Sequence, residues 1–121
     1  MNRDLVFIEH VLDSIHAIEE FTKGLSNEQF ISSRLQQSAV VRELEIIGEA
    51  VKNISADLKR KYPKVKWRDI TATRDKVIHH YFGVDFAIVW DIVKVDLPDL
   101  KKEVALIKKK LIKDSSHGPN S

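Results

Sequence analysis

Apolar residues recur along this chain at steps of three and four, and this spacing restricts its fold more than any other feature. One series near the start consists of Leu5, Ile8, Leu12, Ile15 and Ile18. A second series in the middle consists of Val40, Leu44, Ile47, Val51 and Ile54. Because an α-helix has 3.6 residues per turn, each series lies on one helical face, which must be buried. The sequence therefore predicts an all-α fold, an antiparallel bundle of about five helices.

Local signals predict where the helices of the first half begin and end. Gly24 is expected to stop the first helix. Ser26 and Gln29 have the spacing of a capping box, which would start a short helix. A long helix is predicted over residues 34–53, and Ser55 is expected to cap a short helix after it.

In the second half, a helix is predicted from Asp69 to Tyr81, and Gly83 is expected to end it. Asp85 is a good N-cap for the next helix. Pro98 should break or kink that helix, because proline brings no backbone N–H. A final amphipathic stretch is indicated by Leu100, Val104, Ile107 and Leu111.

Composition limits the classes of protein to which the chain can belong. Its 121 residues fit one domain, predicted here as residues 1–113, with 114–121 as a flexible C-terminal tail. The absence of cysteine excludes thiolate zinc sites, disulfides and cysteine nucleophiles. No signal-peptide segment and no apolar run of roughly 18 residues is present. We therefore expect a cytoplasmic protein without membrane association.

The apolar face of the first helix is wider than one stripe. It includes Leu5, Phe7, Ile8, Val11, Leu12, Ile15 and Ile18. This width has two explanations, a helix that is deeply buried within the chain or a seam between two copies of it.

The segment from Arg74 to Tyr81 carries the candidate chemistry. Arginine offers a rigid fork of donors that matches phosphate oxygens, and the imidazole of His79 can exchange a proton near neutral pH. Arg74, His79 and Tyr81 are therefore candidate catalytic residues for cleaving a phosphodiester without metal. Asp75, four residues before His79, could hold its ring. His80 is a second imidazole on a different helical face.

The spacing also indicates how such a site would be assembled. At about 100° per residue, Arg74 and Tyr81 share a helical face, whereas Arg74 and His79 are about 140° apart. A second copy of the helix, related by a two-fold axis, would line one cleft with both kinds of side chain. Ordinary structural roles remain open: an exposed or acid-paired Arg74, a simple Asp75–His79 helix pair, and a half-buried Tyr81.

Several blocks in order resemble the HepT-like toxins of the HEPN superfamily. They are the central helix at 41–51, the signature at 74–85, and the C-terminal part at 85–90 and 96–100. The resemblance implies an all-α homodimer that acts on RNA as a metal-independent ribonuclease toxin. It also implies a partner, an MntA-type nucleotidyltransferase antitoxin that silences the toxin by adding AMP to Tyr81.

A basic segment just before the signature helix is a candidate RNA-binding surface. Its six cations are Lys59, Arg60, Lys61, Lys64, Lys66 and Arg68. Tyr62 and Trp67 lie among them and could stack on bases. The alternative is a solvated loop with Trp67 anchored in the core.

No cofactor and no metal site is expected. The histidines lack ligand-like spacing, and no glycine-rich phosphate loop is present. The leading hypothesis is therefore a ribonuclease toxin. One alternative is a non-catalytic HEPN-like helical module that binds a nucleotidyltransferase partner or a nucleotide. Another is a helical interaction domain in which the signature occurs by chance.

Overall fold

The computed structural model describes residues 3–79 and 85–116, except for the side chains of 76–79 and 115–116. Throughout these residues every regular element is helical. The elements are α1 (Arg3–Thr22), α2 (Asn27–Ser32), α3 (Arg34–Asn53), α4 (Ala56–Lys61), α5 (Trp67–His79), α6 (Phe86–Asp91), the π-helical segment η2 (Ile92–Asp96) and α7 (Leu97–Ser116). The predicted all-α fold is confirmed.

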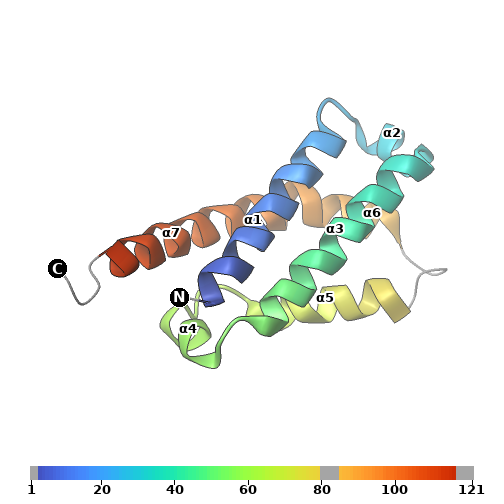
Figure 1. Cartoon of the computed structure of the whole chain (residues 1–121). Coiled ribbons are helices and arrows are strands. Elements are labelled where there is room, and N and C mark those ends of the chain that lie inside the picture. The colour runs from blue at the N-terminus through green and yellow to red at the C-terminus, as the bar shows by residue number, and fades with distance from the viewer. Residues whose placement is uncertain (1–2, 80–84, 117–121) are drawn as a thin grey trace.

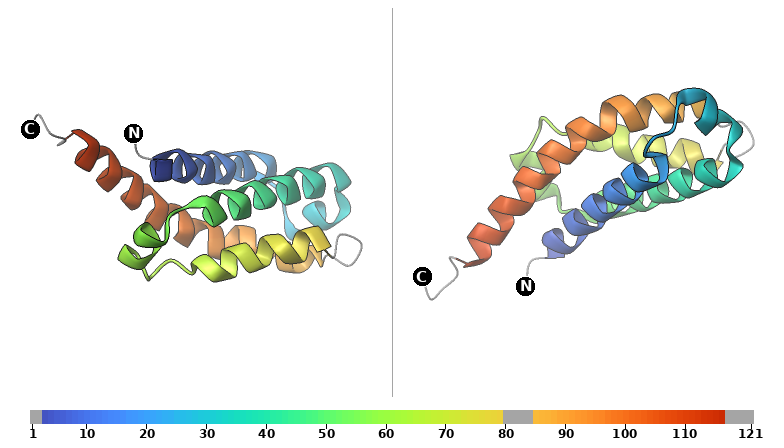
Figure 2. Two further views of the ribbon diagram at one scale, coloured as in Figure 1. Left: turned by 60° about the horizontal axis from the view of Figure 1, so that its bottom comes forward. Right: turned by 90° about the horizontal axis from the view of Figure 1, so that it is seen from above.

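The long helices pack as an antiparallel bundle (Figure 1). α1 runs antiparallel to α3 and contacts both α3 and α7, while α5 contacts α3. α6, η2 and α7 follow one another along a continuous helical path that returns beside α5 (Figure 2). The central helix α3 thus lies between α1 and α5, and it positions residues from both.

The core is built from the two predicted apolar stripes. Ile8, Ile15 and Ile18 on α1, and Val40 and Val51 on α3, are each at most 1% exposed. Full burial of such a side chain contributes roughly 1.5–3 kcal/mol, so the α1–α3 contact is the main apolar interface of the bundle.

The wide face of α1 is covered within the chain itself. Ile8, Val11 and Leu12 are buried, and Leu5 and Phe7 are partly buried against the core. The first explanation, a deeply buried helix, therefore accounts for most of this face. Leu5 and Phe7 keep part of their surface exposed, and a homodimer seam there stays a prediction.

Side-chain caps fix most of the helix starts. Ser26 and Gln29 form the predicted capping box. The Ser26 hydroxyl accepts the Gln29 backbone N–H at 3.1 Å, and the Gln29 side-chain oxygen accepts the Ser26 backbone N–H at 2.9 Å. Ser55 caps α4 as expected, and its hydroxyl accepts from the Leu58 N–H at 3.1 Å. Gly24 has φ +76°, a left-handed conformation that glycine adopts without strain, just after α1 ends.

Asp4 ties the start of α1 to the end of α3. Its carboxylate accepts the Ser55 backbone N–H at 2.8 Å and the Ser55 hydroxyl at 2.6 Å. These charge-assisted bonds join residues far apart in sequence. They set the register in which α1 lies along α3.

The second half departs from the prediction in its details. α5 begins at Trp67, two residues before the predicted Asp69, because the Trp67 indole is buried and donates to the Tyr62 carbonyl at 3.1 Å. The predicted end at Tyr81 and stop at Gly83 lie outside the described residues. Asp85 caps α6 as predicted, by accepting the Ala87 N–H at 2.9 Å.

Pro98 does not interrupt the helical path. The path widens to π geometry just before the proline, and the Leu97 N–H bonds to the Ile92 carbonyl five residues earlier. This wider turn accommodates a residue that brings no N–H donor. α7 then continues through Ser116, so the expected boundary at residue 113 falls inside the helix.

Across residues 3–79 and 85–116, none of the helices combines the length and the apolar character that crossing a membrane requires.

Candidate functional site

The site begins where α5 crosses α3 at a glycine. A Cβ atom built on Gly48 would lie 2.1 Å from the Cβ of Arg74 and 2.4 Å from its Cγ. No side chain fits there, so the aliphatic stem of Arg74 packs directly on the α3 backbone. Gly48 thereby lets the start of the Arg74 side chain lie against α3.

Two carboxylates contact this guanidinium. Nη2 of Arg74 lies 3.1 Å from an Oε2 of Glu49, and Nη1 lies 3.2 Å from Oδ1 of Asp75. Both acids are about half exposed, so each pair contributes at most about 1 kcal/mol. The Arg74 side chain itself is only 25% exposed. The packing against α3 therefore restrains it more than the ion pairs do.

The guanidinium keeps unused hydrogen-bonding capacity. Among the described residues, the buried Nε of Arg74 has no hydrogen-bond partner. Guanidinium carries five N–H donors, and the two ion pairs occupy one nitrogen each. Donors on Nη1 and Nη2 thus remain for a phosphate oxygen that approaches from the solvent side.

Arg74 lies on the wall of an open groove between α1, α3 and α5, which we call the Arg74 groove. Its volume is about 390 Å³. Besides Arg74 it is lined by Phe7, His10, Arg42, Glu45, Ile46, Glu49, Ala50 and Asn53.

The structure places only part of the predicted signature. Arg74 and Asp75 are described fully, and the Asp75 carboxylate contacts Arg74. The backbone of His79 ends α5, but its side chain lies outside the described residues, as do His80 and Tyr81. The pairing of Asp75 with His79, and the roles of His79 and Tyr81, therefore remain predictions.

Helix α3 forms a wall of the site that the prediction from the sequence did not include. Four polar residues, Arg42, Glu45, Glu49 and Asn53, follow one another at steps of three and four along that helix. This is a polar stripe of helical period beside the apolar one. Together with Gly48 inside a long helix, it was the signal that could have identified this wall of the groove.

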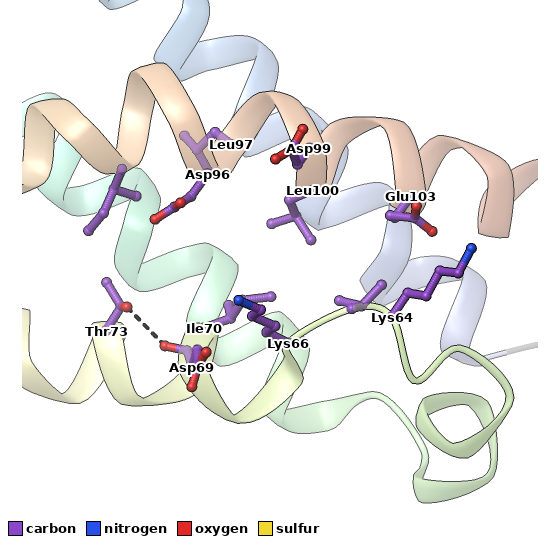
Figure 3. A pocket seen from close by; sticks show the side chains of 12 residues that line it. Lys64, Lys66, Asp69, Ile70, Thr73, Asp96, Leu97, Asp99, Leu100 and Glu103 are labelled. Atoms are coloured by element: carbon purple, nitrogen blue, oxygen red, sulfur yellow. Dashed lines mark hydrogen bonds between the residues drawn. The ribbon is translucent and has the colours of Figure 1, made fainter.

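A second groove, which we call the α7 groove, is shown in Figure 3. One side of it is formed by the loop between α4 and α5 together with α5, and the other side by η2 and α7. Its volume is about 330 Å³. Lys64 and Lys66 lie on one side, and Asp96, Asp99 and Glu103 on the other. In the described part of the chain no ion pair joins the two sides.

The predicted RNA-binding cations are displayed at the surface. Five of the six are exposed and Lys59 is partly exposed. The aromatic residues among them are less available: Trp67 is 8% exposed, and the Lys110 ammonium lies 5.5 Å from the centre of the Tyr62 ring. The alternative in which Trp67 is anchored in the core is therefore correct for that residue.

Comparison with known proteins identifies the family. A model of the family described as "Ribonuclease HepT-like" matches residues 11–107. A "Probable ribonuclease HepT" of Thermococcus cleftensis is 46% identical over 103 residues, 85% of this chain and 94% of that protein. The chain belongs to the HepT-like ribonuclease family.

One of the similar relatives is much longer than the chain. The "Gamma-glutamylcyclotransferase and putative RNase" of Methanocaldococcus jannaschii is 40% identical over 121 residues, and the match covers 99% of this chain. The chain spans only 54% of that relative's length. No solved structure shows significant similarity to the chain.

Proposed function

We propose that the chain is a metal-independent endoribonuclease toxin, with Arg74 and His79 as catalytic residues. The observation that carries the proposal is the Arg74 guanidinium, fixed by packing at a glycine crossing and presented to an open groove. The chain's family and the ribonuclease names of its relatives support RNA as the substrate.

The proposed reaction is an internal transfer. The ribose 2′-oxygen attacks phosphorus and loses its proton to a base, while the P–O5′ bond breaks and O5′ receives a proton from an acid. His79 is proposed for this proton exchange, with Asp75 in support. Arg74 stabilises the charge that develops on the phosphoryl oxygens. The products carry a 2′,3′-cyclic phosphate and a 5′-OH.

The reaction requires a homodimer in this proposal. α5 is regular from Trp67 to His79, which puts positions 74 and 79 about 140° apart around its axis. Arg74 is directed toward Glu49 on α3. A second copy would bring its own Arg74 and His79 to the same cleft. Light scattering should give twice the 13.9 kDa chain mass, and a monomer at micromolar concentration would contradict this step.

The exposed cations from Lys59 to Arg68 are proposed to guide the RNA backbone toward the groove. Their charges are solvated and mobile, which suits a contact that is independent of sequence. Binding should therefore weaken steeply as salt concentration rises.

Control of the toxin is proposed to act at Tyr81. An MntA-type nucleotidyltransferase would attach AMP to its hydroxyl, and the added phosphate would compete with RNA for Arg74 and repel the RNA backbone. Tyr81→Phe should escape neutralisation when it is incubated with the transferase, ATP and Mg²⁺. Mass mapping that places AMP on another residue would contradict the assignment.

The ribonuclease proposal is tested by incubating the purified protein with total RNA in EDTA, beside an Arg74→Ala, His79→Ala double variant. The wild type should produce fragments with cyclic-phosphate ends, and the variant should not. A strict requirement for Mg²⁺ or Mn²⁺, or 5′-phosphate products, would overturn it.

One observation favours a second candidate, a non-catalytic module that binds a nucleotidyltransferase partner or a nucleotide. Glu49 and Asp75 already contact Arg74 and would compete with a phosphate. Such a module would bind its partner through the same helices but leave RNA intact in the EDTA assay. The cleavage result therefore separates the two functions.

A further inference from the structure

The Arg74 groove is lined by apolar and charged residues that Arg74 does not need in order to bind a phosphate. Phe7, Ile46 and Ala50 give it apolar surface, and the charges of Arg42 and Arg74 are matched by Glu45 and Glu49. A phosphate would use only the arginines, so the apolar surface remains for another part of the ligand. It suits a flat, mostly neutral group with polar edges.

The register of the helices divides this groove into two parts. Asp4 is bonded to Ser55, and α1 runs antiparallel to α3 from that point. Phe7 and His10 consequently lie beside the last turns of α3, where Ala50 and Asn53 are located. Arg42 and Glu45 lie about 12–16 Å further along α3, at 1.5 Å per residue from Asn53. Arg74 reaches the groove between these two parts, beside Glu49.

The first part has the components of an aromatic recognition site. The rings of Phe7 and His10 pack edge to face, with centroids 6.1 Å apart and an interplanar angle of 85°. This contact favours one orientation of the two rings relative to each other beside the groove. Stacking on a fixed ring is the usual means by which proteins hold the base of single-stranded RNA.

Asn53 adds a polar edge to this part. Its amide nitrogen donates to the Glu49 carbonyl at 2.8 Å, which fixes the orientation of the amide. Its side-chain oxygen accepts no hydrogen bond from the described residues. The Asn53 side-chain oxygen can therefore accept a hydrogen bond from an exocyclic amino group of a base. Adenine, cytosine and guanine carry such a group, and uracil lacks it.

We propose that the Phe7–His10–Asn53 end of the Arg74 groove is a nucleobase subsite for the RNA substrate. It takes a base with an exocyclic amino group, while Arg74 holds the adjacent phosphate and Arg42 a further one. The subsite rests on the proposed function, because it assumes that RNA is the substrate, and it adds a preference among bases that the catalytic residues do not provide.

Equilibrium binding tests the subsite separately from cleavage. The protein carries His79→Ala so that it cannot cut, and the probes are fluorescein-labelled octamers of adenylate, cytidylate and uridylate. The octaadenylate and octacytidylate should bind about 5-fold or more tightly than the octauridylate. His10→Ala and Asn53→Ala should each weaken octaadenylate binding by about 5- to 10-fold and reduce the difference from octauridylate.

Matched controls distinguish the subsite from general effects. His16→Ala changes another exposed histidine on α1, and Ser38→Ala changes another exposed uncharged polar residue on α3. Both should bind within about twofold of the background protein, since neither residue lines the groove. Melting temperatures confirm that the four variants remain folded.

The possible results separate the two proposals. Equal binding of octaadenylate and octauridylate, or normal binding by His10→Ala and Asn53→Ala, overturns the subsite even if the wild type cleaves RNA. If base-selective binding is lost in these variants but the wild type leaves RNA intact, the subsite stands and the ribonuclease proposal falls. If the variants change the particle mass without changing RNA affinity, a second copy of the chain covers the groove, and the subsite is overturned.

Discussion

The two grooves of this molecule share the helix α5 but treat charge in opposite ways. In the Arg74 groove, one guanidinium is three-quarters buried, packed on a glycine and contacted by Glu49 and Asp75. In the α7 groove, Lys64 and Lys66 are exposed and form no ion pair with the described acids across from them. Both grooves are lined in part by apolar residues, so the two grooves do not differ in that respect.

The difference bears on which groove the proposed catalysis would use. A reacting phosphate needs donors that are already in position, because reorganising them during the reaction costs free energy. Arg74 meets this condition better, since the start of its side chain packs against the α3 backbone at Gly48. The lysines of the α7 groove keep their rotamer freedom and their water, so they can attract an anion without orienting it.

The largest expected effect comes from Arg74→Lys, which keeps the charge but removes the planar fork. We expect the rate of RNA cleavage to fall by about 100-fold or more, because a point charge cannot replace two positioned donors. Asp99→Asn in the α7 groove is the control and should change the rate by less than about threefold, because Asp99 is exposed and forms no ion pair with the other described residues. An Arg74→Lys protein that cleaves within fivefold of wild type would remove the distinction between the grooves.

Gly48→Ala should destabilise the fold at the crossing itself. The new methyl would lie 2.1 Å from the Arg74 Cβ, so α3 and α5 must separate. We expect the free energy of unfolding to fall by about 1–3 kcal/mol in urea titration. Ser38→Ala, an exposed change on the same helix, should stay within about 0.5 kcal/mol of wild type. Equal stability of the two variants would mean that Arg74 is not held by close packing.

Glu49→Gln should separate the two consequences of the ion pair. The carboxylate helps to orient Arg74, but it also competes with phosphate for the guanidinium. We therefore expect kcat to fall by about 3- to 10-fold while KM for RNA also falls. Steady-state kinetics on a fluorogenic RNA measures both. A rise in KM with unchanged kcat would instead indicate that Glu49 contacts the RNA.

The smallest effect is expected for Glu103→Gln in the α7 groove. Glu103 lines that groove but forms no ion pair with the other described residues. Cleavage should stay within about twofold of wild type and the free energy of unfolding within about 0.5 kcal/mol. A clear loss of cleavage would show that the α7 groove also takes part in the reaction.

The sequence by itself determined the helices and most of their ends. The capping box at Ser26, the cap at Ser55 and the cap at Asp85 are all formed as predicted. Helical periodicity and capping involve residues only two to four positions apart, so these signals can be read locally. The apolar stripes of α1 and α3 likewise belong to the core of the folded chain.

Only the tertiary structure decided which residues surround Arg74. Gly48 and Glu49 are 26 and 25 positions before it in the chain, and His10 is farther still. These residues lie near Arg74 only because α1, α3 and α5 cross as they do. The spacing of residues within one helix does not predict how three helices cross. The structure also shows that most of the broad face of α1 is buried within the chain, with Leu5 and Phe7 partly exposed. An apolar face shows only that something must cover it, and the partner is determined by the packing of the whole bundle.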